Sequence, residues 1–200
     1  MASLAAATET TSLTLIEGAV LGVLLDRPMH GFELARAFAR NGVIGEILTA
    51  KRPVVYRALS TLEAKHLLTP KRAEASTRGP ARETVGVNAA GRHALYAWLE
   101  TPVAHMRDVR VELLIKLVLR ERLGLDAQPF IARQIDEFTP IYEALNSASL
   151  PRDRVQRFST LWRRQNSHSV MRFLDMIHAD ASAGVTRRNE SPHSGKDPHV

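Results

Sequence analysis

The chain has 200 residues, of which 44% are hydrophobic and 24% charged, as in ordinary globular proteins with a packed core. Its formal net charge of +6 favours an anionic partner, nucleic acid before an acidic membrane. The absence of cysteine excludes disulfides, thiolate zinc sites and thiol nucleophiles, and fits a cytoplasmic protein. No apolar run approaches the roughly 18 residues that span a bilayer. Residues 1–12 lack the pattern of a secretory signal.

Three helices are predicted in the first third of the chain. Residues 13–25 (LTLIEGAVLGVLL) are apolar on nearly every side, so we expect the buried central helix of a small domain. Residues 30–40 (HGFELARAFAR) space their apolar side chains for a second short helix, which Asn41-Gly42 would end in a left-handed conformation. A third helix is expected to begin at Pro53, where a missing N–H is harmless.

A hairpin and a fourth helix complete the predicted first domain. Residues 67–74 and 83–87 are expected to form two strands, joined by a loop rich in Ser, Gly, Pro and Arg. Asn88 is a favourable N-cap for the fourth helix, and Pro102 marks the end of this unit. Three helices, a two-stranded hairpin and a linking helix are the element order of a winged helix-turn-helix domain.

The second half of the chain is predicted to be helical. Residues 108–123 carry nearly two apolar stripes, which suggests that they cover a second surface. Residues 131–145 form a heptad seam that Pro140 must kink or interrupt. A last helix is expected at 153–178, with Val155, Phe158 and Trp162 in its apolar stripe. The predicted fold class is therefore mainly α with a small β-hairpin. The predicted domains are a disordered tail at 1–12, a winged helix-turn-helix DNA-binding domain at 13–102, a helical dimerisation domain at 103–180 and a disordered tail at 181–200.

Positive charge is concentrated in the predicted third helix and hairpin. Eight of the 27 basic residues lie between Lys51 and Arg82, with only two acidic residues, so this segment has a local charge of +6. Lys and Arg that neutralise phosphates release counterions and supply most of the affinity for a duplex. A basic run alone is more often a solvated face, so the element order carries the interpretation that this is a DNA-binding surface.

Candidate DNA contacts lie on the third helix and the hairpin. Lys51 and Arg52 would meet phosphates at the start of the helix, and Arg57 would enter the major groove, where Arg pairs with guanine O6 and N7. Arg78 and Arg82 flank the Gly-Pro tip of the hairpin and would reach a narrow minor groove or its phosphates. The other candidate contacts, for which an ordinary core or solvent-facing role is the alternative, are Tyr56, Ser60, Thr61, Lys71 and Arg72.

The C-terminal half and the fourth helix supply candidates for dimerisation and control. Trp98 could line an effector pocket, because such pockets are mostly apolar and aromatic, although core or interface packing is the favoured interpretation. The eight histidines show no spacing that would hold a metal, and no nucleophile, carboxylate pair or phosphate loop marks an enzyme. We therefore expect no metal and no cofactor. The predicted dimerisation residues are Leu114, Leu117, Val118, Ile131, Ile135, Phe138, Tyr142 and Leu145.

Several short stretches resemble the PadR family of bacterial transcriptional regulators. Residues 30–34 (HGFEL) are similar to the family's H-G-Y-E-L, and residues 55–63 (VYRALSTLE) fit its L-Y-x-x-L-x-x-L-E pattern. The family's G-P-x-R is matched by residues 79–82 (GPAR), and the end of its T-x-x-G-R by residues 91–92 (GR). Its W-L ending is matched by residues 97–99 (AWL). Each fragment alone is weak, but their order and spacing make the combination specific.

The resemblance implies a dimeric DNA-binding regulator, more often a repressor than an activator, whose winged domain binds an operator. The helical second half looks like the longer branch of the family, which is related to virulence-activator C-terminal domains. Three sites depart from the family's pattern: Val85 replaces a tyrosine, Asn88 a threonine, and Pro53-Val54 the small polar residues that commonly open the recognition helix.

The sequence therefore predicts a cytoplasmic winged-helix transcriptional regulator, not an enzyme, that binds a pseudo-palindromic operator as a homodimer. Its two recognition helices would reach major grooves about one turn, roughly 34–36 Å, apart. Control by a small-molecule effector is a further hypothesis. Two alternatives remain: a sequence-independent nucleic-acid-binding protein that lacks operator preference, and a winged-helix protein-docking module that ignores DNA.

Overall fold

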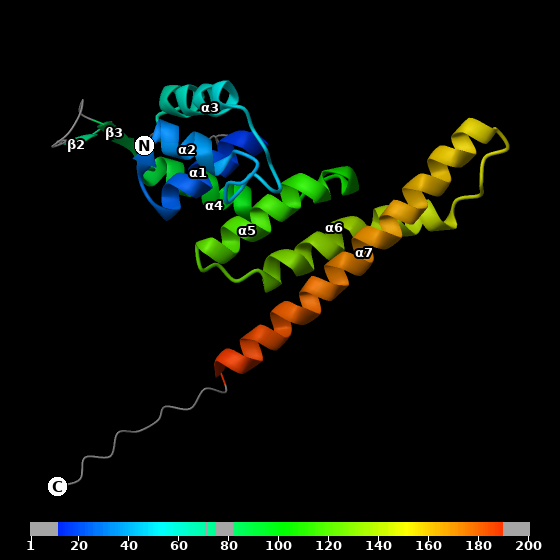
Figure 1. Ribbon diagram of the computed structural model, residues 1–200. Helices are drawn as coiled ribbons and strands as arrows, with labels where there is room; N and C mark the ends of the chain where they lie inside the picture. Colours follow the sequence, from blue (N-terminus) through cyan, green and yellow to red (C-terminus); the bar gives the residue numbers. More distant parts are fainter. Residues whose placement is uncertain (1–11, 71, 75–81, 190–200) are drawn as a thin grey trace, which may run out of the picture. The chain divides into compact units, whose positions relative to one another are not determined.

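The computed structural model describes residues 12–70, 72–74 and 82–189 (Figure 1). The chain divides into two compact units, one formed by Met1–Val103 with Arg107–Leu125, the other by Ala104–Met106 with Asp126–Val200. Helices dominate both units, and one small sheet belongs to the first, so the predicted fold class is confirmed. Within the described ranges, no helix is long and apolar enough to cross a membrane.

Helix α1 (Leu15–Asp26) is the centre of the first unit. It contacts α2, α3, α4 and α5, and Ala19, Val20 and Leu21 on different sides of it are fully buried. Its start is a capping box, in which the Thr14 hydroxyl accepts from the Glu17 N–H and the Glu17 carboxylate accepts from the Thr14 N–H. The prediction of a central helix from its all-round apolarity is confirmed.

Helices α2 (Gly31–Ala37) and α3 (Arg52–Ala64) form the helix-turn-helix pair. The segment between them is anchored by Phe38 and Ile44, both fully buried. Gly42 does not end α2 with a left-handed conformation, as we expected, because α2 already stops at Ala37 and the φ of Gly42 is not positive. Glycine is needed there because a Cβ would lie 2.3 Å from the carbonyl oxygen of Ala37.

The end of α3 is a Schellman motif built on a histidine. His66 has a φ of 55°, the left-handed region, and its N–H donates to the Glu63 carbonyl. The N–H of Leu67 donates back to the Leu62 carbonyl. This turn directs the chain from α3 into the hairpin.

The hairpin strands β2 (Arg72–Glu74) and β3 (Arg82–Val85) pair antiparallel, with Arg72 opposite Thr84 and Glu74 opposite Arg82. Both are shorter than predicted, and an isolated bridge between Leu68 and Val87 closes the base. A two-residue strand that we did not predict, β1 (Met29–His30), pairs with the other edge of β3, which gives the order β1-β3-β2. The loop that joins the hairpin strands lies outside the described residues.

Helix α4 (Ala89–Glu100) follows the hairpin, and its predicted N-cap is confirmed, because the Asn88 side chain accepts from the Gly91 N–H at 2.8 Å. The next helical stretch combines a 3-10 turn (Met106–Asp108), a π-helical turn (Val109–Leu113) and α5 (Leu114–Arg122). Its residues 107–125 belong to the first unit, beyond the boundary at residue 102 that we expected. The reason is packing, since Ile115 and Leu119 are fully buried in the same core cluster as α1.

The second unit is built around a pair of long helices, α6 (Gln128–Ser147) and α7 (Arg154–Asn189), which run side by side (Figure 1). Pro140 does not interrupt α6, which continues for seven residues beyond it. Helix α7 extends past the tail boundary expected at residue 181, because alanines 179, 181 and 183 are strong helix formers. The remaining predicted tail segments, 1–11 and 190–200, lie outside the described residues.

Candidate nucleic-acid interface

Helix α3 has one apolar side and one polar, cationic side. Val55, Ala58, Leu59 and Leu62 are buried and join the core of the first unit. The residues predicted to contact DNA fall on the remaining surface of the helix, and all except the half-buried Thr61 are exposed: Lys51, Arg52, Tyr56, Arg57 and Ser60. The helical period therefore separates the packing side of α3 from its exposed side.

The start of α3 is positively charged and has no capping side chain. Lys51 occupies the N-cap position with φ −71° and ψ 146°, but its side chain makes no cap hydrogen bond. Arg52 and Pro53 follow, and the first turn contains no acidic residue. A cation at this end of a helix is unfavourable, because the helix dipole already places partial positive charge there. The arrangement does not serve the stability of the helix, but it suits an anionic partner.

Arg52 is held by two aromatic side chains. Its guanidinium carbon lies 5.5 Å from the centre of the Phe32 ring and 5.1 Å from the centre of the Tyr56 ring. Its Nη2 also donates to the Tyr56 hydroxyl at 3.4 Å. Sequence reasoning missed the role of Phe32, because nothing in the local pattern of α2 pairs it with a residue 20 positions later.

The hydroxyls of Ser60 and Thr61 are engaged inside the helix. Ser60 donates to the Tyr56 carbonyl at 3.2 Å, and Thr61 donates to the Arg57 carbonyl at 3.0 Å. Either hydroxyl can still accept a hydrogen bond, but its donor is already used. These two residues are therefore weaker candidates for phosphate contact than the exposed cations beside them.

Lys65, which was counted in the basic segment, is used within the fold. Its Nζ lies 2.9 Å from Glu17 Oε2 and donates to the Ser12 carbonyl at 3.0 Å. Burial raises the pKa of Glu17, but hydrogen bonds with Thr14 and Lys65 together hold that pKa below its ordinary value. The ion pair ties the start of α1 to the end of α3 and removes one cation from the candidate interface.

The hairpin contributes the remaining predicted contacts. Arg72 begins β2 and Arg82 begins β3, on paired antiparallel strands beside each other in the sheet. Lys71 and Arg78 lie outside the described residues. The backbone thus places two of the four predicted hairpin cations on the wing of the helix-turn-helix domain.

Trp98 packs between three helices of the first unit. A Cβ on Gly18 of α1 would lie 2.7 Å from the Trp98 ring, so this glycine makes room for the indole. On α5, the Lys116 ammonium lies 4.7 Å from the Trp98 ring centre, pairs with Glu112 at 2.8 Å and donates to the Thr101 carbonyl at 2.8 Å. Burial lowers the pKa of Lys116, whose side chain is 1% exposed, although Glu112 acts in the opposite direction. This geometry agrees with the packing interpretation of Trp98 that the sequence favoured.

The predicted dimerisation residues are covered to different degrees within one chain. Ile131 and Phe138 are buried, and the rest are partly buried, among them Tyr142, whose hydroxyl lies 2.9 Å from His168 Nδ1. The rest of the partly buried group is Leu114, Leu117, Val118, Ile135 and Leu145.

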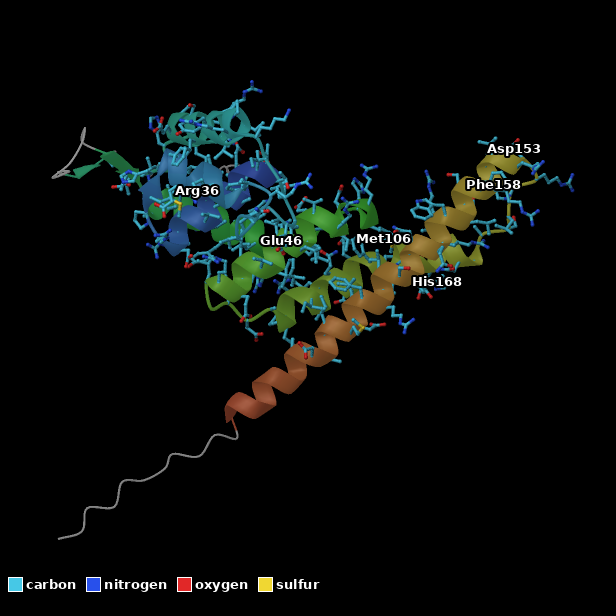
Figure 2. All side chains as sticks on the ribbon, viewed as in Figure 1. Arg36, Glu46, Met106, Asp153, Phe158 and His168 are labelled. Atoms are coloured by element: carbon cyan, nitrogen blue, oxygen red, sulfur yellow. The ribbon has the colours of Figure 1, made fainter. Side chains whose placement is uncertain are left out.

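Three strongly exposed apolar side chains of the second unit lie instead on the first half of α7. Phe158, labelled in Figure 2, is 61% exposed, Trp162 is 70% exposed and Val155 is 75% exposed. Their spacing of three and four residues puts them on one side of the helix. The sequence showed this stripe, but not that it is left uncovered within the chain.

Together, these features define the first unit as a winged helix-turn-helix domain, with an exposed cationic side on α3 and a two-stranded wing. Residues 20–97 match the Transcriptional regulator PadR-like family, so this part of the chain is a PadR-like domain and the resemblance noted from its motifs is confirmed. The members of this family are transcription factors, not enzymes.

Solved structures that align with most of this chain are distant from it in sequence. One is PadR of Bacillus subtilis in complex with operator DNA, 16% identical, with a TM-score of 0.43 over 84% of this chain and 99% of that chain. Another is the virulence activator AphA of Vibrio cholerae, 22% identical, with a TM-score of 0.37 over 84% of this chain and 98% of that chain. No curated protein is significantly similar to the sequence.

Proposed function

We propose that the chain is a homodimeric, cytoplasmic transcriptional regulator, a repressor, that binds a pseudo-palindromic operator through α3 and the wing. The observation that carries the proposal is the exposed cationic side of α3. Arg52 and Arg57 stand there without an ion pair to any residue that the structure describes, and the only acidic residue of this helix, Glu63, lies near its far end. An unneutralised cationic helix beside a wing is the arrangement that a duplex would complement.

Arg57 is the candidate for base recognition. It lies in the second turn of α3, which has 13 residues and is therefore about 20 Å long, a length that fits into a major groove. A guanidinium can donate two parallel hydrogen bonds to guanine, which is worth about 1–3 kcal/mol of discrimination against another base. Lys51 and Arg52, at the start of the helix, would contact phosphates.

The exposed stripe of α7 supports the homodimer. A helix that leaves Phe158 and Trp162 more than half exposed presents apolar surface that a second copy of the chain would remove from water. Dimerisation would also set the distance between two recognition helices, which a pseudo-palindromic operator requires. Phe158→Asp together with Trp162→Asp should give a monomer by sedimentation and weaken operator binding. A chain that is already monomeric at the concentrations at which it binds DNA would contradict this part.

Effector control is proposed as a further level of regulation. Trp98 contacts α5 through Lys116, so a small aromatic ligand that displaced the ammonium from the indole would disturb the packing of α5 on α4. A compound screen with operator affinity as the signal would test this. The hypothesis fails if no ligand changes the affinity of the dimer.

The central test is selection of binding sites from random duplexes, followed by competition and mutation. The unaltered chain should hold its selected site against roughly a thousandfold excess of random DNA. Arg57→Ala should relax specificity at one base pair, and Arg52→Ala should reduce the slope of log affinity against log salt by about 0.9. Arg110→Ala, an exposed arginine outside α3 and the wing, is the matched control. Equal competition by random DNA would favour a sequence-independent binder, and no binding at low salt would favour a protein-docking module.

A further inference from the structure

The aromatic pair around Arg52 is more than ordinary surface packing. Phe32 is the second residue of α2 and is 58% exposed, whereas the core-facing Leu34 of the same helix is fully buried. The core does not need this ring. What it does contact is the guanidinium of Arg52, in the first turn of the other helix of the pair.

The backbone is also adapted to this cluster. Gly31, directly before Phe32, lies so close to α3 that a Cβ there would be 3.2 Å from the Tyr56 hydroxyl and ring. The start of α2 therefore lies against the first turns of α3, with Tyr56 one helical turn after Arg52. Two rings from two helices meet one guanidinium at centroid distances of 5.5 and 5.1 Å.

We propose that Phe32 is a positioning residue for DNA binding: with Tyr56 it holds the Arg52 guanidinium by its faces, so that the edge of the guanidinium meets a DNA phosphate. A guanidinium can stack on aromatic rings and still donate hydrogen bonds in its own plane. Only one of these donors is used by the Tyr56 hydroxyl. A free arginine side chain loses rotamer entropy when it is fixed on a ligand, and a stacked one has already lost part of it.

This inference rests on the proposed function, and a double-mutant cycle separates the two. Phe32→Ala should weaken binding to selected and random duplexes alike, about two- to fivefold, the size expected of a cation–π contact at an exposed site. The same substitution should have no further effect in an Arg52→Ala background. Thermal stability should fall only slightly, by no more than this contact contributes, because the ring is mostly exposed.

The choice of substitutions tests whether the aromatic face matters. Phe32→Tyr and Phe32→Trp should keep the affinity, while Phe32→Leu, which retains apolar bulk but no ring, should behave like Phe32→Ala. Val43→Ala, at an apolar residue of equal exposure between α2 and α3, is the control and should bind as the unaltered chain does. In the free protein, NMR signals of the Arg52 side chain should be shifted upfield by the rings and should move back in Phe32→Leu.

Three results would overturn the inference while leaving the proposed function intact. These are full affinity in Phe32→Leu, additive effects of Phe32→Ala and Arg52→Ala, and a loss confined to one selected sequence, which would indicate a base contact instead of a phosphate contact. If the unaltered chain binds no duplex at low salt, the proposed function fails, and the inference fails with it.

Discussion

Replacing Lys51 with serine should make the domain more stable and a poorer DNA binder. Lys51 has the extended backbone of an N-cap residue but supplies no cap hydrogen bond, and no acidic side chain follows in the first turn of α3. A serine hydroxyl there could accept from the Val54 N–H, since Pro53 has none, but that N–H already donates to the Lys51 carbonyl at 2.9 Å. The gain is therefore at the low end of the N-cap range, about 0.5 kcal/mol. Removing a cation from the positive end of the helix dipole adds about 0.3–1 kcal/mol. The expected gain in the free energy of unfolding is therefore about 1–1.5 kcal/mol.

Thermal unfolding and salt-dependent DNA binding would test both halves of this prediction. A gain of that size should raise the melting temperature by roughly 2–6 °C for a chain of this length. The slope of log affinity against log salt should become shallower by about 0.9, one phosphate contact. Thr14→Ala, which removes an existing cap on α1, should lower stability by about 1 kcal/mol and leave the slope unchanged. A lower melting temperature in Lys51→Ser, or an unchanged slope, would refute the reasoning.

Three further substitutions probe the supports of the domain. Glu17→Gln should lower the free energy of unfolding by about 1–3 kcal/mol at pH 7, since it weakens hydrogen bonds to a charged group. Because the folded pKa of Glu17 is lowered, the stabilisation by its carboxylate is complete above about pH 4.5 and is lost as the pH falls through the folded pKa. The stabilities of the variant and the unaltered chain should therefore converge in acid titrations. Lys116→Met should change the free energy of unfolding at pH 7 by no more than about 1 kcal/mol. Because burial lowers the folded pKa of Lys116, the unaltered chain should become more stable relative to this variant as the pH rises toward 10.5. Parallel stability profiles of the two chains against pH would contradict the lowered pKa. His66→Gly should raise the free energy of unfolding by about 0.5–1 kcal/mol in a denaturant titration, because glycine accepts the left-handed φ of 55° without strain. An unchanged free energy of unfolding would mean that the imidazole itself stabilises the fold.

The sequence predicted the elements whose cause is local. Helix α1 follows from apolarity on all sides, and α4 begins where Asn88 can cap it. The wing follows from two short strands separated by loop residues. In contrast, β1 has only two residues, Met29 and His30, and no period of two can be recognised in so short a strand. It forms because an edge of β3 is available to pair with it.

The candidate site was predicted in composition but not in arrangement. Lys65 contributes to the charge of the basic segment, but the fold pairs it with Glu17, 48 residues earlier. Phe32 and Arg52 are 20 residues apart, and no periodicity links residues on different helices. Similarly, the sequence identified the apolar stripes of the second half, but it did not show which are covered within one chain. These are properties of tertiary packing, so local rules could not give them.

Two of the places where the structure departs from local rules are places where the proposed function requires a partner. Helix α1 has a capping box and α4 has an Asn88 cap, but α3 begins with Lys51 and Arg52, without a cap or an acid. Most of the large apolar side chains of the first unit are buried, but the first half of α7 exposes Phe158 and Trp162. A chain selected for stability alone would correct both features with single substitutions. A polyanion explains the first and a second copy of the chain explains the second, and an operator-bound dimer supplies both at once.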